Sequence, residues 1–329
     1  MQLKNKNVLV TGAAGFIGSH LIEELVKKGA KVKALVRYNS AHNLGNLDFL
    51  DKRIKDNIEI YFGDIREMDI LAKAMQGTDA VFNLAALVGI PYSYLNPHEV
   101  VMTNMVGTLN MLTVARDLGV KKFIQTSTSE VYGSPDNVPI KETDRLKPQS
   151  PYSASKIAAD SIALSFFYSF SFPVAIIRPF NTYGPRQSAR AVIPAIICQA
   201  LKGNNVKLGS LAPRRDFTFV KDTVEGFIKV CESDKSVGNV INIGTGSDYS
   251  IGDAVGIIGE IVGRKLKVIQ QTKRIRPSKS EVVRLKADNS KAVKLLNWRP
   301  NYTFQQGLRI TVDFIRDNPR LYDPKEYAI

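Results

Sequence analysis

The sequence is poor in the residues that build metal centres and disulfide frameworks. Its 329 residues include two cysteines, Cys198 and Cys231, and three histidines. A secreted, disulfide-stapled fold needs more cysteines, so this pair predicts buried thiols in a reducing compartment, the cytoplasm. His20, His42 and His98 form no HxxH, HExxH or CxxC spacing. We therefore expect neither a metal site nor a histidine-based catalytic triad.

A membrane-spanning run is also missing. The longest uncharged stretch, residues 161–177, is too short for a membrane span and contains Pro173. The N-terminus begins like a basic, then apolar signal peptide, but Gly12 and Gly15 interrupt its apolar run and lead into a helix start. We expect a soluble protein without a membrane partner.

Acidic residues are outnumbered, 31 against 45 Lys and Arg, which gives a formal net charge of +14. Such an excess suits nucleic acid, an anionic membrane or a small polyanion such as a nucleotide diphosphate, and composition does not choose among them. The apolar fraction of 44% and the charged fraction of 23% are ordinary for a globular protein. Disordered and collagen-like classes are therefore excluded.

Apolar runs rich in Val, Ile and Phe alternate with amphipathic segments through the first half of the chain. This order predicts βαβ units and hence an α/β fold, a doubly wound parallel sheet with a smaller C-terminal α/β substrate domain. We place the dinucleotide-binding domain at residues 1–180 plus about 218–245, which rejoin the main sheet, and the smaller domain at 181–217 plus 246–329. The strands of the first half are expected at residues 7–10, 31–36, 58–62, 80–85, 121–127 and 173–178.

A glycine-rich loop, TGAAGFIG, lies between the first predicted strand and a predicted helix. Gly12 permits the tight turn, and Gly15 lets backbone N–H groups approach a pyrophosphate at the positive end of the helix. Gly18 lets helix and strand pack closely. With Phe16 and Ile17, these residues form the predicted cofactor loop.

The ends of the next strands predict the rest of a cofactor site. Arg37 stands where an NAD-selective fold usually has an acidic residue for the ribose hydroxyls, and it suits a 2′-phosphate instead. The expected cofactor is therefore NAD(P), with NADP favoured. Asp64, followed by Ile65, is placed to bind the adenine amino group. The residues expected to leave room for the cofactor after the fourth strand are Leu84, Ala85 and Ala86.

Tyr152 and Lys156 are four residues apart in a predicted helix, so they share one face. A lysine ammonium there is expected to lower the pKa of the phenol and make Tyr152 a usable base near neutral pH. The Tyr-x-x-x-Lys pattern alone is common on helices. Behind a dinucleotide loop and the fifth strand, it indicates a catalytic pair.

Together, TGAAGFIG, FNLAA, STSEVYG, YSASK, RPFNTYGPR and RDFTFV resemble the extended short-chain dehydrogenase/reductase family of nucleotide-sugar enzymes over the whole chain. The resemblance implies a Rossmann fold and a tightly bound, recycled cofactor. In that family, epimerases usually lack a carboxylate after the threonine of strand five, whereas dTDP-glucose dehydratases carry Asp-Glu. GDP-mannose 4,6-dehydratases carry Ser-Glu and UDP-glucuronate decarboxylases Thr-Ser-Glu. The pair Ser129-Glu130 leaves these last two chemistries open.

As a dehydratase, the chain is expected to use four residues. Tyr152, assisted by Thr128, takes the proton of the sugar O4 while the nicotinamide accepts the hydride. Glu130 removes the C5 proton and protonates the departing O6, and the hydride returns to C6. Because Ser129 stands where dTDP-glucose enzymes have an acid, one carboxyl must serve twice. Lys156 completes the set.

The segment of residues 89–97 is aromatic and uncharged, which favours a neutral sugar over the carboxylate of a decarboxylase substrate. Ser93, Tyr94 and Ser129 are expected on the sugar side. VGIPYSY and QTSTSEVYG most resemble dehydratases that act on nucleotide-linked N-acetylglucosamine in legionaminic-type pathways. The residues that the resemblance assigns to the substrate diphosphate are Asn181, Arg215 and Arg276.

The expected function is thus a UDP- or GDP-N-acetylglucosamine 4,6-dehydratase, with a UDP-glucuronate decarboxylase or a sugar 4-epimerase as alternatives. A non-enzymatic alternative, prompted by the charge of +14, is a cofactor-binding protein that contacts nucleic acid. Because the Tyr-Lys-Glu set is complete, we expect an enzyme with no nucleic-acid partner. Relatives pair the helices after Pro97 and Pro151 between subunits, so a homodimer is expected.

Overall fold

The computed structural model describes residues 1–40, 43–274 and 277–322. Its main sheet has seven parallel strands in the order β11-β6-β5-β4-β1-β2-β3, which confirms the predicted doubly wound sheet. The predicted return of a late strand is also confirmed, since β11 pairs with β6. The strands are β1 (Asn7–Thr11), β2 (Lys31–Val36), β3 (Ile58–Phe62), β4 (Ala80–Asn83), β5 (Lys122–Thr126), β6 (Val174–Pro179) and β11 (Val240–Ile243).

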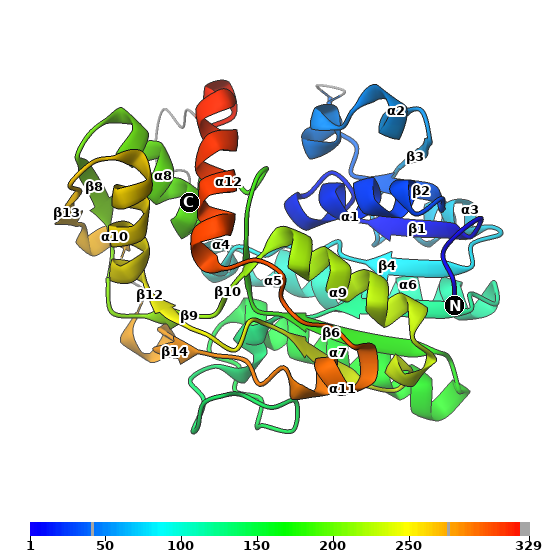
Figure 1. Ribbon diagram of the computed structural model, residues 1–329. Coiled ribbons are helices and arrows are strands. Elements are labelled where there is room, and N and C mark those ends of the chain that lie inside the picture. Colours follow the sequence, from blue (N-terminus) through cyan, green and yellow to red (C-terminus); the bar gives the residue numbers. More distant parts are fainter. Residues whose placement is uncertain (41–42, 275–276, 323–329) are drawn as a thin grey trace.

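Helices cover both faces of this sheet (Figure 1). Helices α1 and α9 pack against each other on one face, and α3, α6 and α7 pack together on the other. The central strands are buried on both sides, with Val8 and Val10 in one core and Leu9 in the other, which is why they are continuous apolar runs in the sequence. The helices are α1 (Phe16–Lys27), α3 (Met68–Met75), α6 (Gly107–Asp117), α7 (Pro151–Phe170) and α9 (Val220–Glu232), with the short α2 (Lys52–Lys55) at one edge.

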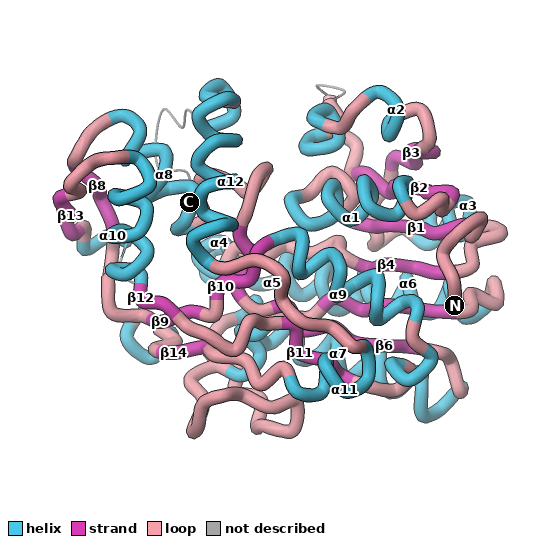
Figure 2. Tube along the Cα trace, viewed as in Figure 1, coloured by secondary structure: helices cyan, strands magenta, loops and turns pink. Residues whose placement is uncertain are grey.

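A second group of elements lies beside the main sheet. Helices α8, α10 and α12 contact one another, and β8 and β13 form a two-stranded sheet well apart from the main one (Figure 2). This group contains parts of both segments, 181–217 and 246–329, that we predicted for the smaller substrate domain. The exact domain boundaries stay a prediction. Its elements include α8 (Val192–Lys202), β8 (Asn205–Leu208), β9 (Arg214–Arg215), β12 (Tyr249–Ser250), α10 (Ile251–Val262), β13 (Lys267–Gln270), β14 (Arg284–Leu285) and α12 (Phe304–Asp317).

The chain between the two groups is tied down by buried contacts. Trp298 is fully buried and its Nε1 donates to the Asp222 carbonyl oxygen at 3.0 Å, which fastens the C-terminal segment to α9. Among the described helices, none is long and apolar enough to cross a membrane. The remaining connecting elements are β7 (Asn181–Tyr183), β10 (Phe217–Phe219) and α11 (Ser290–Leu296).

The segment after β4 is more helical than the sequence suggested. Residues 90–95 form a short helix, α4 (Ile90–Leu95), with Pro91 in its first turn. The predicted helix after Pro97 is α5 (Pro97–Val101) joined to α6 by one π-helical turn (Met102–Val106). Such turns often occur at functional sites, and this one places Asn104 in the interior next to the cavity described below.

Candidate active site

A cavity of about 1020 Å³ lies where the carboxyl ends of β1, β2, β4 and β5 meet the second group of elements. Open α/β sheets bind ligands at this edge, where the strand order reverses between β1 and β4. The predicted site residues that line the cavity are Gly12, Gly15, Phe16, Ile17, Gly18, Arg37, Asp64, Ile65, Leu84, Ala85, Ala86, Tyr94, Thr128, Ser129, Glu130, Tyr152, Lys156, Asn181 and Arg215.

The glycine loop fits a dinucleotide. Gly12 has a φ of +64°, and a Cβ there would lie 2.9 Å from the backbone of Leu84 and Ala85. At Gly18 a Cβ would lie 2.3 Å from the Gly12 carbonyl oxygen, so only glycine allows α1 to start so close to the strand. The first turn of α1 has no side-chain cap, and its N–H groups are available to a pyrophosphate.

The end of the cavity at Arg37 and Asp64 is charged. Asp64 accepts from Arg66 at 2.9 and 2.7 Å, and this hydrogen-bonded guanidinium holds the pKa of the carboxyl below its usual range. The carboxylate predicted to meet adenine is thus engaged by Arg66, a partner that the sequence analysis missed. Arg37 Nε lies 4.0 Å from the same carboxylate, and its side chain is 66% exposed.

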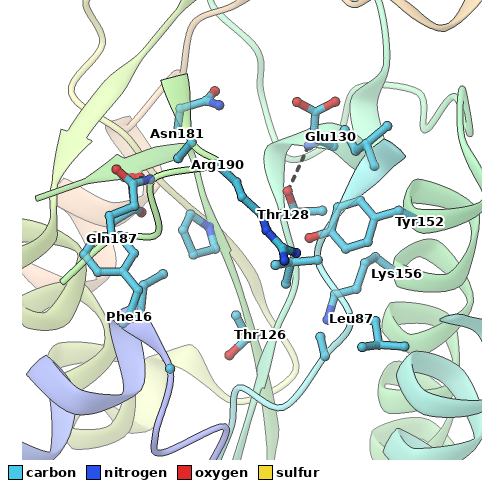
Figure 3. Close-up of a pocket in the computed structure, with 18 of the residues that line it drawn as sticks. Phe16, Leu87, Thr126, Thr128, Glu130, Tyr152, Lys156, Asn181, Gln187 and Arg190 are labelled. Carbon is cyan, nitrogen blue, oxygen red and sulfur yellow. Dashed lines mark hydrogen bonds between the residues drawn. The ribbon is translucent and has the colours of Figure 1, made fainter. Parts of the chain in front are cut away.

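Tyr152 and Lys156 are both buried on α7 and face the cavity together with Thr128 (Figure 3). The Thr128 hydroxyl hydrogen-bonds the phenol and lowers its pKa against the effect of burial. The expected lowering of the phenol pKa by Lys156 is not found. Burial raises the pKa of Tyr152, because a buried phenolate loses its solvation. The negative charges of Glu130 and Asp160 raise this pKa further. Burial also lowers the pKa of Lys156 to about 8, with Asp160 acting in the opposite direction.

Glu130 lies on a short 3₁₀ helix (Ser129–Tyr132) that directly follows Thr128. Its backbone N–H donates to Thr128 Oγ1 at 3.2 Å, which orients the Thr128 hydroxyl (Figure 3). No described residue forms an ion pair or hydrogen bond with its carboxylate. An unpaired carboxylate on the same cavity wall as Tyr152 can move protons to and from a bound molecule.

The start of α7 is fixed from two sides. Ser150 and Ser153 form a capping box, with N–H to Oγ distances of 3.1 and 3.0 Å. Asn104, on the π-helical turn, donates to Ser155 Oγ at 3.0 Å and exchanges hydrogen bonds with the backbone of Leu87 at 2.7 and 3.0 Å. The turn therefore aligns α7 with the loop after β4.

Arg190 was missed by the sequence analysis. It lies in the loop between β7 and α8, and its guanidinium points toward Thr128 and Tyr152 (Figure 3). Within the described ranges, no residue accepts a hydrogen bond from this guanidinium or pairs with it. One signal was present in the sequence: a cation just before a helix N-terminus is unfavourable unless an anion lies nearby.

Three further buried polar atoms on the cavity wall have no hydrogen-bond partner in the described part of the chain. They are Thr126 Oγ1, Asn181 Oδ1 and Gln187 Oε1 (Figure 3). Buried polar groups are normally satisfied, so atoms of this kind on a cavity wall fit contacts to a bound molecule. Thr126 and Gln187 were not among the predicted residues.

The cavity wall also carries Arg215, one of the residues predicted to bind the substrate diphosphate. Arg215 is buried, and its Nη2 lies 3.3 Å from Glu281 Oε1. Tyr94 and Ser280 share a hydrogen bond of 2.5 Å, and Ser280 Oγ also donates to the Gln149 carbonyl oxygen at 2.7 Å. The segment around Ser280 is therefore joined to both α4 and the loop before α7.

Two predicted substrate residues are not placed at the cavity. Ser93 is fully buried and its hydroxyl donates to the Ile90 carbonyl oxygen at 2.7 Å, because the segment is a helix and this side chain points inward. The structure therefore gives no support to a substrate contact by Ser93. Arg276 lies outside the described residues.

Comparison with known proteins agrees with this geometry. A family model described as GDP-mannose 4,6 dehydratase matches residues 9–311. The UDP-glucuronate 4-epimerase of Thermodesulfobacterium geofontis is 33% identical over 95% of this chain and 97% of its own. Two solved structures cover 95–97% of this chain. They are dTDP-glucose 4,6-dehydratase DesIV from Streptomyces venezuelae with NAD and TYD bound (30% identity, 100% of that chain, TM-score 0.87) and UDP-glucuronic acid 4-epimerase from Bacillus cereus with UDP-glucuronic acid and NAD (31%, 99%, 0.86).

Proposed function

The chain belongs to the family of NAD-dependent nucleotide-sugar dehydratases and epimerases described by the GDP-mannose 4,6 dehydratase model, and we propose that it is a nucleotide-sugar 4,6-dehydratase. The observation that carries the proposal is the unpaired carboxylate of Glu130, held two residues from Thr128 on the cavity wall. Oxidation at C4 alone needs no such group, whereas loss of water across C5 and C6 needs a base for the C5 proton. The proposed substrate is UDP- or GDP-N-acetylglucosamine.

In the proposed reaction, Tyr152 takes the O4 proton and Thr128 holds the phenol in line through its hydrogen bond. A nicotinamide cofactor, when bound, accepts the hydride from C4 and returns it to C6. The 4-ketone makes the C5 hydrogen acidic, so Glu130 can remove it. The same carboxyl then gives its proton to O6, which leaves as water. When the hydride returns to C6, C5 takes up a proton from solvent, and Tyr152 releases the proton that it took from O4.

The test is Glu130→Gln, with solvent deuterium and mass spectrometry. C4 oxidation should persist, while loss of water and deuterium exchange at C5 should fall by roughly 10²- to 10⁴-fold, the usual contribution of a positioned acid or base. Glu225→Gln, a surface carboxylate paired with Lys229, is the control and should behave as the wild type. Elimination at the original rate in Glu130→Gln would show that this carboxyl is not the base.

For the cofactor, the solved relatives contain NAD and give no support to NADP. The preference for NADP rests on Arg37 alone, whose side chain is exposed at the end of the cavity near Asp64. Arg37→Ala should weaken NADP binding by roughly 10-fold or more, as expected for a lost charge-assisted hydrogen bond, and leave NAD binding unchanged. Calorimetric titration of both cofactors checks this. Equal losses for both would remove the basis for an NADP preference.

Arg190 favours a second candidate function. The uncharged segment 89–97 offers no partner for a uronate carboxylate, whereas Arg190 brings a cation toward Thr128 and Tyr152 from another loop. A guanidinium suits a sugar C6 carboxylate. Incubation with UDP-glucuronate separates the candidates, since decarboxylation releases carbon dioxide and 4-epimerisation leaves the mass unchanged.

If the second candidate holds, Arg190→Leu should raise the KM for UDP-glucuronate at least tenfold. A lost charged contact of this kind is worth about 1.5–3 kcal/mol. The same change should have little effect on turnover of a neutral nucleotide sugar if the dehydratase proposal holds. Product analysis by NMR distinguishes the two results.

We also propose a cytoplasmic homodimer that pairs α6 and α7 between subunits. Leu109 and Tyr168 are 40% and 75% exposed on these helices, and exposed large apolar side chains can take part in protein–protein contacts. Tyr168→Asp should convert the dimer to a monomer, as measured by light scattering. A wild-type monomer at micromolar concentration would contradict the proposal.

A further inference from the structure

A buried ion pair lies directly behind the catalytic face of α7. Asp160, one helical turn after Lys156, accepts from Arg178 Nε and Nη2 of β6 at 3.1 and 3.0 Å. The two side chains are 2% and 4% exposed. Burying two charges is expensive, and apolar packing of similar volume often stabilises as well or better. The pair therefore calls for a role other than stability.

One oxygen of this carboxylate joins two parts of the active site. Asp160 Oδ2 also accepts from Ser127 Oγ at 2.7 Å, and Ser127 directly precedes Thr128 at the end of β5. Asp160 shares a helix face with Lys156 and Tyr152, because the three are spaced by four residues. The hydrogen bond between Ser127 and Asp160 therefore holds Thr128 at a set distance from the Tyr152 phenol.

The other oxygen, Oδ1, is buried and accepts no hydrogen bond in the described ranges. The charged and titratable groups around it come from three elements: Tyr152 and Lys156 from α7, Arg178 from β6, and Tyr132, which is bonded to Arg178, from the 3₁₀ helix. Burial lowers the pKa of Lys156, and the charge of Asp160 raises it. Arg178 has its own hydrogen bonds to Asp160 and Tyr132.

We propose that Asp160 is a positioning residue for C4 oxidation, which keeps Lys156 charged and holds Thr128 against Tyr152. The inference rests on the proposed function only through the C4 oxidation step, which dehydratase, decarboxylase and epimerase reactions share. It does not depend on the identity of the sugar. The titration of Lys156 can also be followed without any substrate.

The experiment uses Asp160→Asn, which keeps the shape of the side chain and removes its charge. The fraction of charged Lys156 is measured in the cofactor-loaded protein by amine labelling across pH, with peptide mass spectrometry. Its midpoint should fall by about one pH unit, the size expected from loss of a nearby opposite charge. The basic limb of the rate of C4 oxidation should move to lower pH by the same amount.

The two failures are distinguishable. A shifted Lys156 midpoint in a protein that dehydrates no nucleotide sugar would leave the role of Asp160 intact and overturn the proposed function. An unchanged midpoint, with activity reduced equally at every pH, would mean that Asp160 is merely structural. That result overturns the inference.

Because Asp160→Asn leaves Arg178 buried without its partner, a second variant combines Asp160→Asn with Arg178→Met. It removes both charges, so the fold is relieved of an unpaired cation, and the Lys156 midpoint should still fall. The matched control is Tyr132→Phe, which removes hydrogen bonds of 2.9 and 2.8 Å to Arg178 and Asn242 but leaves the Asp160 charge. It should lower the Tm without moving the midpoint. A shift equal to that of Asp160→Asn would overturn the inference.

Discussion

Single residues in the active site are governed by burial more than by charge. Tyr152 and Lys156 occupy the positions that the sequence predicts, yet burial pushes the pKa of the phenol up and that of the ammonium down to about 8. Both shifts favour the neutral forms. We therefore expect the phenol to act as a base near neutral pH only with a cation nearby, such as Lys156 in its charged form.

Removal of the phenol tests this role. Tyr152→Phe should reduce C4 oxidation by roughly 10²- to 10⁴-fold, because the O4 proton loses its acceptor. Cofactor affinity, measured by fluorescence titration, should change little, since the ring and its packing remain. C4 oxidation at the wild-type rate would show that another group takes the proton.

The sequence predicts those residues of the candidate site whose positions depend on local backbone geometry. Gly12, Gly18 and Tyr152 were predicted from the sequence and line the cavity, because backbone geometry or helical spacing dictates them locally. Arg190 and Gln187 were missed, because the direction of a loop side chain depends on tertiary packing that no local pattern encodes. Ser93 was misplaced for the related reason that α4 turns it inward.

At the scale of elements, the buried strands were the most predictable part. The predicted strands 7–10 and 173–178 match β1 and β6 to within one residue at each end, because a strand covered on both faces is largely apolar. Helix α4 and the π-helical turn were not predicted. A six-residue helix and a single bulged turn have too few residues to establish a period.

The junction of α1 with β1 offers a test at this scale. Gly18→Ala should push α1 away from the Gly12 carbonyl oxygen, lower stability by about 1–3 kcal/mol and weaken cofactor binding. Gly256→Ala, in α10, is the control: its Cβ would meet nothing within 4 Å. It should raise stability by up to about 1 kcal/mol. Chemical denaturation with and without cofactor measures both, and unaltered cofactor binding in Gly18→Ala would contradict the assigned close approach.

Across the whole molecule, the glycine-loop helix and the loop before α8 are clamped together. His20 Nε2 hydrogen-bonds the Pro185 carbonyl oxygen at 2.9 Å, and Arg186 Nη2 donates to Glu23 at 2.8 Å. Burial, followed by the charge of Arg186, lowers the pKa of His20 to about 4. The imidazole of this clamp is therefore neutral near pH 7.

This clamp predicts a pH dependence of stability. The folded pKa of His20 lies below the unfolded value of 6.5, so its contribution is complete above pH 6.5 and is lost as pH falls toward about 4. The wild type should lose roughly 3 kcal/mol more than His20→Gln over that interval. Urea denaturation of both proteins at matched pH gives the difference, in which shared carboxylate effects cancel. Parallel stability curves would contradict the lowered pKa.

The order in which the main sheet is completed also matters while the protein is being made. Strand β6 ends at Pro179, but its outer neighbour β11 starts at Val240. At typical synthesis rates of roughly 5–20 residues per second, the ribosome needs several seconds to cross these roughly sixty residues. During that interval the nascent chain carries an apolar strand edge open to pairing with other chains. Translation speed between residues 180 and 243 should therefore influence how much of the protein escapes aggregation.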